Sequence, residues 1–118
     1  MSAQAFPKRA RLCDDDQIAR VFKRGKRIRG AEFTLLFGDN DRLFPRLCII
    51  VAKKNLRHAH ERNTFKRVIR EFFRTHQKEL GSLDVVVLAN KQTELFTKKT
   101  LHCAMEQQWK KLISSLNE

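Results

Sequence analysis

Residues 60–76 read HERNTFKRVIREFFRTH and combine two kinds of side chain at helical spacing. The apolar side chains fall at i, i+3, i+4, i+7 and i+8, namely Phe65, Val68, Ile69, Phe72 and Phe73. This spacing places them on one side of an α-helix, with a core expected beneath them. Another side of the same helix carries Arg62, Asn63, Lys66, Arg67, Arg70 and Arg74. We therefore predict an amphipathic helix over 60–76 with one apolar and one cationic face.

The cationic face favours a polyanionic partner. Arginine pairs with phosphate through two parallel hydrogen bonds, and i, i+4 spacing aligns successive cations along the helix. The alternative is an ordinary solvated face, but such faces usually mix charge signs because like charges at i, i+4 repel each other. We interpret this face as a nucleic-acid contact.

Strand patterns flank the helix on both sides. Residues 43–52 form an apolar, β-branched run, and residues 84–89 contain Val85-Val86-Val87-Leu88, which is typical of a buried strand. Two strands joined through a helix imply parallel pairing. Lys53 and Lys54 follow the first of these strands, at the end where α/β folds usually bind ligands. An ordinary polar loop is the alternative for this pair of lysines.

The N-terminal part predicts a helix over 14–24. Asp14, Asp15 and Asp16 suit the positive end of a helix dipole, and Gly25 is a plausible stop. A short extra strand is expected near residues 26–29.

Residues 33–37 follow as a strand, and residues 38–41 have the composition of a turn. Together with the strand over 43–52 they predict a β-hairpin. Pro45 belongs near the start of the second strand or at a sheet edge, because proline cannot donate a ladder hydrogen bond.

A final helix is expected after Thr97, which can cap it. Its apolar positions recur at roughly helical spacing, namely Leu101, Met105, Trp109, Leu112 and Leu116. The predicted order is helix, three strands, helix, strand, helix. This order predicts an α+β fold in one domain spanning residues 1–118.

The net charge of +12 in 118 residues is concentrated in two segments. Residues 8–29 hold nine basic and three acidic residues, and residues 53–74 hold eight basic and two acidic residues, so each segment has a net charge of +6. The remaining residues sum to zero. A basic surface built by both segments is therefore expected, with nucleic acid as its partner.

Other classes of protein are not indicated. The chain has no apolar run long enough for a transmembrane helix and no apolar segment near Met1 that would indicate secretion. Cys13, Cys48 and Cys103 are far apart and odd in number, which fits reduced thiols in a cytosolic protein. We expect a cytoplasmic protein without a membrane partner.

Two further groups of residues suggest chemistry, each with a simpler alternative. Phe22, Phe33 and Phe37 could stack on unpaired bases, but aromatic residues at these spacings more often belong to a core. His58, His60 and Glu61 suggest a metal or acid–base site, yet two histidines at i, i+2 do not share a helical face. A solvated loop at the helix entry is the simpler interpretation of the second group.

The sequence VAKKNLR at 51–57 followed by AHERNTFKRVIRE at 59–71 closely resembles the bacterial ribonuclease P protein subunit. That family combines a strand ending in Ser/Ala-Lys-Lys with a helix of pattern R-N-R-x-x-K-R-x-x-R-E. Phe6-Pro7, VFKRG at 21–25 and DVVV at 84–87 also have counterparts in the family. The resemblance covers essentially the whole chain.

The resemblance implies the protein subunit of a ribozyme that removes the 5′ leader from precursor tRNA. The RNA subunit, with Mg²⁺ that it mainly binds itself, performs the endonucleolytic hydrolysis, so no catalytic residue, metal site or small-molecule substrate is expected in the protein. The implied fold is an α/β sandwich with a mixed sheet and a left-handed βαβ crossover, an exception to the usual right-handed rule. The partners implied are the catalytic RNA and the leader, which lies in a cleft between the first helix and the sheet.

The resemblance implies site residues at the positions of this chain that match the family pattern. The expected contacts with the catalytic RNA are Arg57, Arg62, Asn63, Lys66, Arg67, Arg70 and Arg74. The expected leader-cleft residues are Phe22, Phe33, Leu36, Lys53 and Lys54. The chain departs from the family at Thr64, where arginine is common, at Cys48, often glycine, and at Leu36, often aromatic.

Three other functions stay open at this point. A structural RNA-binding protein of ribosomal type would carry the same charge without a processing role. A nuclease acting alone would need the group at His58, His60 and Glu61. A helix-turn-helix DNA-binding protein is disfavoured because the basic helix lies between two strands and not beside a partner helix.

Overall fold

The computed structural model describes residues 15–30, 32–40, 44–52, 54, 56–90 and 97–116. Its elements are α1 (Asp15–Arg24), β1 (Lys26–Arg29), β2 (Phe33–Asp39), β3 (Arg46–Ile50), α2 (Ala59–His76), the short 3₁₀ helix η2 (Gln77–Glu79), β4 (Leu83–Ala89) and α3 (Lys98–Leu116). The predicted order of helices and strands is confirmed, including the short strand at 26–29. Among the described helices, none is long and apolar enough to cross a membrane.

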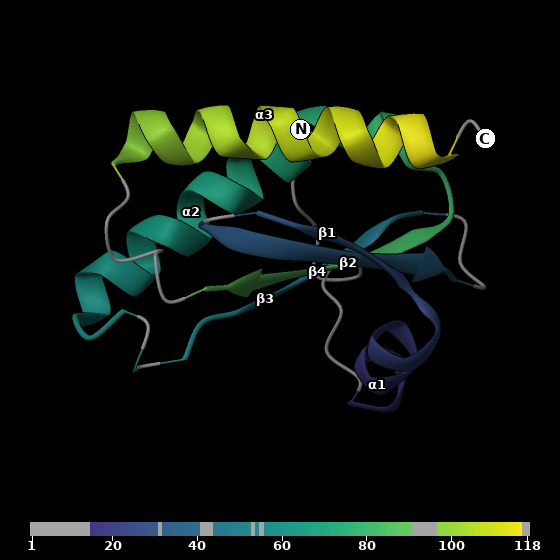
Figure 1. Ribbon diagram of the computed structural model, residues 1–118, viewed down its shortest axis with the longest axis horizontal. Coiled ribbons are helices and arrows are strands. Elements are labelled where there is room, and N and C mark those ends of the chain that lie inside the picture. Colours follow the sequence, from purple (N-terminus) through teal and green to yellow (C-terminus); the bar gives the residue numbers. More distant parts are fainter. Residues whose placement is uncertain are drawn as a thin grey trace, which may run out of the picture.

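The four strands form one mixed sheet in the order β1-β2-β4-β3. β2 runs antiparallel to both of its neighbours, whereas β3 and β4 are parallel, as the strand–helix–strand pattern predicted. Helices α2 and α3 lie on one side of the sheet and α1 on the other (Figure 1). The sheet is therefore the middle layer of three.

The predicted hairpin between residues 33–37 and 43–52 is wrong. The two strands are consecutive in the chain, but β4 lies between them and pairs with both. β4 is buried along nearly its whole length, which suits a central strand covered by helices on both faces. β3 instead takes the sheet edge, and Pro45 directly precedes it, in a place where a missing N–H donor is tolerated.

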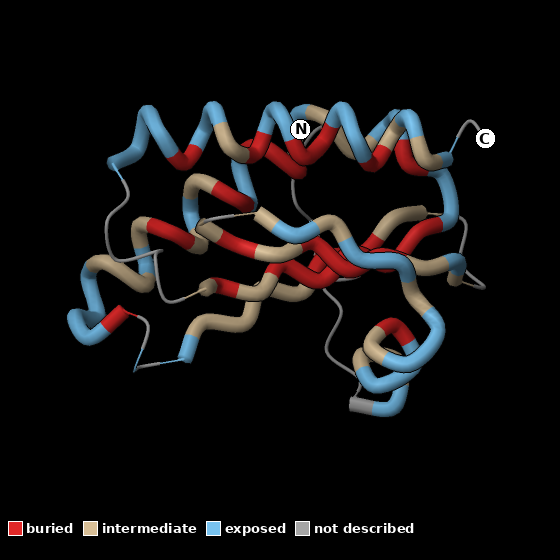
Figure 2. The backbone as a smooth tube through the Cα atoms, in the orientation of Figure 1, coloured by how far each residue is buried: buried red, intermediate tan, exposed pale blue. Residues whose placement is uncertain are grey.

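Side chains alternate between the two faces of the sheet and build two apolar clusters. The larger cluster lies under α2 and α3 and includes Phe33, Leu35 and Phe37 of β2. The smaller cluster lies under α1 and contains Val21, Leu36 and Val86, with partly buried neighbours packed against it. Buried positions accordingly concentrate on the central strands and on the inner sides of the helices (Figure 2).

Both long helices bury most of the positions predicted for them. On α2, the predicted apolar face is buried apart from the half-buried Val68. On α3, the apolar stripe is buried up to Leu112, but Leu116 is 37% exposed and lies outside the core. Thr97 caps α3 as predicted, because its hydroxyl accepts a hydrogen bond from the Thr100 N–H at 3.2 Å, and the Thr100 hydroxyl accepts one from the Thr97 N–H at 2.8 Å.

A buried ion pair connects β3, β4 and α1. Arg46 donates to both carboxylate oxygens of Asp84, from Nε at 2.9 Å and from Nη2 at 2.8 Å. Its Nη1 donates to Oε1 of Gln17 on α1 at 2.6 Å. Asn40 adds a hydrogen bond to Oδ1 of Asp84 at 2.8 Å. Because both charged partners are almost fully buried, this network fixes the start of α1 against the sheet.

Gly25 allows the other end of α1 to approach β2 closely. A Cβ atom at this position would overlap the carbonyl oxygens of Val21 and Phe37, the second at 2.7 Å. Among the described residues positive φ occurs only at Gly81, so Gly25 is required by this close approach and not by its backbone conformation.

We expect Gly25→Ala to lower the free energy of unfolding by about 1–3 kcal/mol, because α1 must move away from β2 to make room for the methyl group. Urea denaturation followed by circular dichroism measures the loss. Gly38→Ala is the matched control, since a Cβ there would meet only the Gly25 Cα at an ordinary 3.6 Å. Its expected change lies within about 0.5 kcal/mol. Equal losses in the two variants would contradict the steric explanation.

Candidate nucleic-acid interface

The outer side of α2 presents a group of exposed polar and cationic side chains. We call this group the α2 basic face and define it as Asn63, Lys66, Arg67 and Arg70. Three of them are exposed and Lys66 is half-buried. No hydrogen bond or ion pair occupies these four side chains within the part of the chain that the structure describes. They are therefore available to a polyanion without loss of an internal contact.

Arg74 differs from these residues because a carboxylate already pairs with it. Its Nη2 donates to Oε1 of Glu71 at 2.6 Å, and its Nε donates to the same oxygen at 3.0 Å. The pair lies at i, i+3 on the exposed surface, with the two side chains 32% and 55% accessible. Exposed pairs of this kind are weak, so a phosphate can compete with Glu71 for Arg74. The internal pair still lowers the net charge at this end of α2.

Arg62 is also engaged within the protein. Its Nη1 donates to the carbonyl oxygen of Leu56 at 2.8 Å and to that of Arg57 at 2.9 Å. Both carbonyls belong to the loop between β3 and α2. Arg62 therefore connects the first turns of the basic helix to the loop that precedes it.

That loop carries the lysines predicted for the leader cleft. Lys54 is exposed in a turn, whereas Lys53 lies outside the described residues. Leu56 is fully buried in the larger cluster and anchors the loop two residues later. Arg57 is exposed just before α2 begins. The loop therefore places Lys54 and Arg57 a few residues before the helix that carries the α2 basic face.

His58, His60 and Glu61 lie at the exposed entry of α2. The two imidazole rings are stacked with centroids 5.7 Å apart, and Nε2 of His58 lies 3.9 Å from Oε1 of Glu61. Within the described ranges, no three His, Cys, Asp or Glu side chains gather where they could hold a metal ion. Cys48 is half-buried and Cys103 is exposed, whereas Cys13 lies outside the described residues.

A second surface lies on the face of the sheet that α1 covers in part. Strand register aligns Arg29, Thr34, Leu88 and Ile50 in one row across all four strands. Cross-strand partners share a face of the sheet, and Leu88 and Ile50 pack against the cluster under α1. Thr34, Leu88 and Ile50 are only half-buried, so α1 leaves this row partly open. Arg29 is exposed at the β1 end of the row.

The structure separates the residues predicted for the leader cleft. Phe22 is half-buried on the α1 side of the sheet and packs against the smaller cluster, as Leu88 and Ile50 of the row also do. Leu36 lies on the same side but is fully buried in the cluster that contains Val21, so it supports α1 from below.

Phe33 does not lie on the α1 side of the sheet, and its assignment to the cleft is wrong. It is fully buried on the opposite face, where its ring packs edge-to-face on Phe65 with centroids 6.2 Å apart. Phe37 is buried in the same larger cluster, so it cannot stack on a base either. Helices cover both faces of β2, and the alternation in the sequence did not show which face stays partly open.

Sequence reasoning missed the residues that line this open row. Arg29 is exposed on β1 opposite Thr34 of the row, and Arg27 is exposed on the same face two residues earlier, opposite the buried Leu36. Alternation within KRIR indicates that Arg27 and Arg29 share a face, but only the pairing with β2 identifies that face as the one under α1. Leu88 and Ile50 carried no chemical signal and are identified by register alone.

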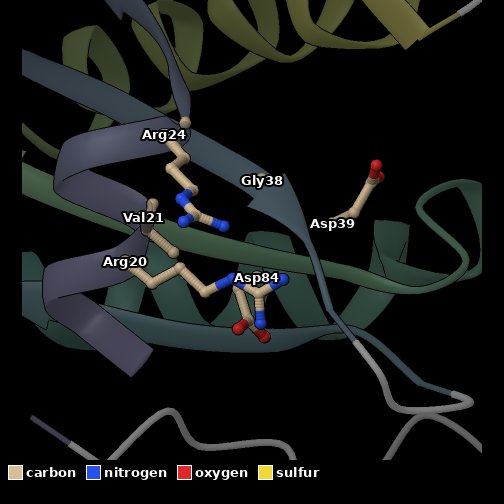
Figure 3. A pocket seen from close by; sticks show the side chains of 7 residues that line it. Arg20, Val21, Arg24, Gly38, Asp39 and Asp84 are labelled. Carbon is tan, nitrogen blue, oxygen red and sulfur yellow. The ribbon is translucent and has the colours of Figure 1, made fainter. Parts of the chain in front are cut away.

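A cavity of about 200 Å³ lies beside α1 at the other end of the same face. Arg20 and Arg24 line it from α1, with Gly38, Asp39 and Asp84 on the side of the sheet (Figure 3). The sheet side of the lining includes Asp39 and Asp84, of which Asp84 is already paired with Arg46. Carboxylates in its lining make the cavity a weaker candidate for a polyanion than the α2 basic face, which contains none.

Comparison with known proteins matches the chain to one family along most of its length. The family described as Ribonuclease P matches residues 6–113. The ribonuclease P protein component of Escherichia coli O157:H7 is 40% identical over 107 residues, covering 91% of this chain and 90% of that protein. The protein of the same name from Shigella boydii serotype 18 has the same identity and coverage.

Solved structures agree with this match. The ribonuclease P protein of Staphylococcus aureus superposes with a TM-score of 0.78 at 27% identity, covering 83% of this chain and 90% of that chain. A ribonuclease P protein structure from Thermotoga maritima gives a TM-score of 0.73 at 29% identity, covering 82% and 94%. The family match over residues 6–113 and the 40% identity to a relative covered over most of both chains show that the chain belongs to the ribonuclease P protein family.

Proposed function

We propose that this chain binds the catalytic RNA of ribonuclease P through the α2 basic face and holds the 5′ leader of precursor tRNA on the α1 side of the sheet. The observation that carries the proposal is the set of α2 cations that have no internal partner among the described residues, next to a loop that presents Lys54. Family membership supports an RNA partner and a role in tRNA processing. Arg57 and the Arg62 nitrogens not bonded to the loop extend the α2 basic face toward the start of the helix.

The leader path follows from the open row on the sheet. A single strand crossing from Arg29 toward Ile50 would meet half-exposed apolar side chains for its bases and a cation at the β1 end for its phosphates. Phe22 on α1 is the aromatic side chain placed to stack on a base there. This path replaces the predicted cleft that included Phe33.

In this proposal the protein binds and orients RNA, and the hydrolysis takes place on the RNA subunit. Mg²⁺ bound mainly by that RNA supplies the charge neutralisation and activated water for phosphodiester cleavage. The protein reduces the repulsion between two polyanions by placing cations between them. Its action is expected in the cytoplasm.

Reconstitution tests the proposal directly. Added to a bacterial ribonuclease P RNA at low Mg²⁺, the protein should raise the rate of precursor tRNA cleavage by at least about tenfold, because its cations replace part of the counterion requirement. Gel analysis of 5′-labelled precursor measures leader release. The RNA alone and the protein alone are the controls.

Two outcomes would contradict the proposal. Tight RNA binding without any gain in cleavage would favour a structural RNA-binding protein of ribosomal type. Cleavage by the protein without RNA, abolished by His58→Ala or Glu61→Ala, would favour a nuclease acting alone.

A further inference from the structure

Arg62 occupies an unusual place among the expected RNA contacts. Each of the two N–H groups on Nη1 can donate one hydrogen bond, and the two carbonyl oxygens of Leu56 and Arg57 accept at 2.8 and 2.9 Å. The nitrogens Nε and Nη2 remain on the same planar group. Arg62 can therefore hold the loop and present donors to a phosphate at the same time.

Two anchors border the loop among the residues that the structure describes. The Leu56 side chain is fully buried, and its N–H donates to the Ala52 carbonyl at 3.3 Å, which closes a turn around Lys54. On the helix side, the His58 carbonyl accepts from the N–H groups of Glu61 and Arg62, both at 3.1 Å. Between these two anchors, the carbonyls of Leu56 and Arg57 are held by Arg62.

We infer that Arg62 is a positioning residue that fixes the loop carrying Lys54 relative to the α2 basic face. Bonds from a charged donor to neutral carbonyls are stronger than ordinary loop hydrogen bonds. Without Arg62, the backbone carbonyl of Leu56, whose side chain is fully buried, would lose its hydrogen-bond donor. The loop would then open more often, while α2 keeps its buried face and its other cations.

The consequence for RNA rests on the proposed function. If Lys54 contacts the leader and the α2 basic face contacts the catalytic RNA, Arg62 sets the distance between the two sites. Substitution of Arg62 should then weaken leader recognition even when the catalytic RNA is saturated with protein. Substitution of a cation that contacts only the catalytic RNA should leave leader recognition unchanged.

Limited trypsin digestion of the full-length protein tests the positioning role without RNA. Cleavage after Lys54 and Arg57, followed by mass spectrometry, should be about tenfold faster in Arg62→Ala than in the parent protein. Arg67→Ala is the matched control, because it removes the same charge from the same helix at an exposed position. Its cleavage rate in the loop should equal that of the parent protein.

Two further measurements separate loop opening from global unfolding. Cleavage after Lys110 in α3 should stay at the parental rate in Arg62→Ala, since a general loss of stability would raise it as well. Arg62→Lys keeps the charge but lacks the planar fork, so its loop should also be cut faster than that of the parent. Equal loop cleavage in the parent, Arg62→Ala and Arg62→Lys would overturn the inference.

The reconstituted holoenzyme tests the consequence. At saturating protein, the ratio of affinities for precursor tRNA and for mature tRNA without a leader should fall about fivefold in Arg62→Ala and stay unchanged in Lys98→Ala, which removes an exposed cation on α3. An unchanged ratio in Arg62→Ala would refute the link to the leader. If the parent protein itself gives no preference for the precursor, the proposed leader site fails, whereas the digestion result still decides whether Arg62 positions the loop.

Discussion

Replacement of Asp84 by alanine is expected to lower the free energy of unfolding by about 3–5 kcal/mol, because it leaves the buried guanidinium of Arg46 without its counter-ion. Both side chains of the pair are less than one-tenth exposed, so water cannot take the place of the carboxylate. Urea denaturation at constant pH and salt measures the change. The variant should also loosen the start of α1, since the same guanidinium holds Gln17.

Asp39→Ala is the control for this loss. Asp39 is exposed at the end of β2, and its removal should change the free energy of unfolding by less than about 0.5 kcal/mol. The double variant Arg46→Met with Asp84→Leu should lose less than Asp84→Ala, because no uncompensated buried charge remains. A loss of under about 1 kcal/mol in Asp84→Ala would contradict the assigned role of the pair.

Neutralising the α2 basic face should produce the largest effect on RNA binding. The combined variant Lys66→Gln, Arg67→Gln and Arg70→Gln removes three of the proposed phosphate contacts. The slope of log affinity against log salt concentration should then decrease in magnitude by about 2–3, at roughly 0.7–0.9 for each contact. At low salt the affinity should fall roughly a hundredfold to a thousandfold. Filter binding to ribonuclease P RNA over a salt series gives both quantities.

An equal change of charge on α3 provides the matched control. Lys98, Lys110 and Lys111 are exposed on that helix, and their replacement by glutamine lowers the net charge by the same three units. If binding depended only on total charge, the two triple variants would behave alike. We expect the α3 variant to change the slope by less than about one. Equal slopes would show that α2 is not the contact surface.

Sequence reasoning was reliable where the signal is local. The helix over 60–76 and the strand over 84–89 were confirmed because their apolar patterns repeat within the element itself. The ion pair between Glu71 and Arg74 was also within reach, since i, i+3 neighbours meet on any helix. Local patterns of this kind do not depend on what the rest of the chain does.

The failures concern partners that are distant in the chain. Turn residues after β2 showed that the chain reverses, but β4 enters between β2 and β3 more than thirty residues later in the sequence. Phe33 has the strand spacing of a possible stacking residue, yet its face of the sheet is the one that α2 and α3 cover. Arg62 belongs to the cationic face by periodicity, and only the folded loop shows that its Nη1 is already bonded.

The amino-acid sequence alone determined the number and order of the α-helices and strands, the cationic character of α2 and the resemblance that led to the family. Tertiary structure decided the strand order, the burial of Phe33 and the internal partners of Arg62 and Arg74. It also created the pairing of Arg46 with Asp84 and the row that begins at Arg29, because both follow from strand register. Side-chain periodicity is a property of neighbouring residues, whereas register is selected by packing between segments far apart in the chain.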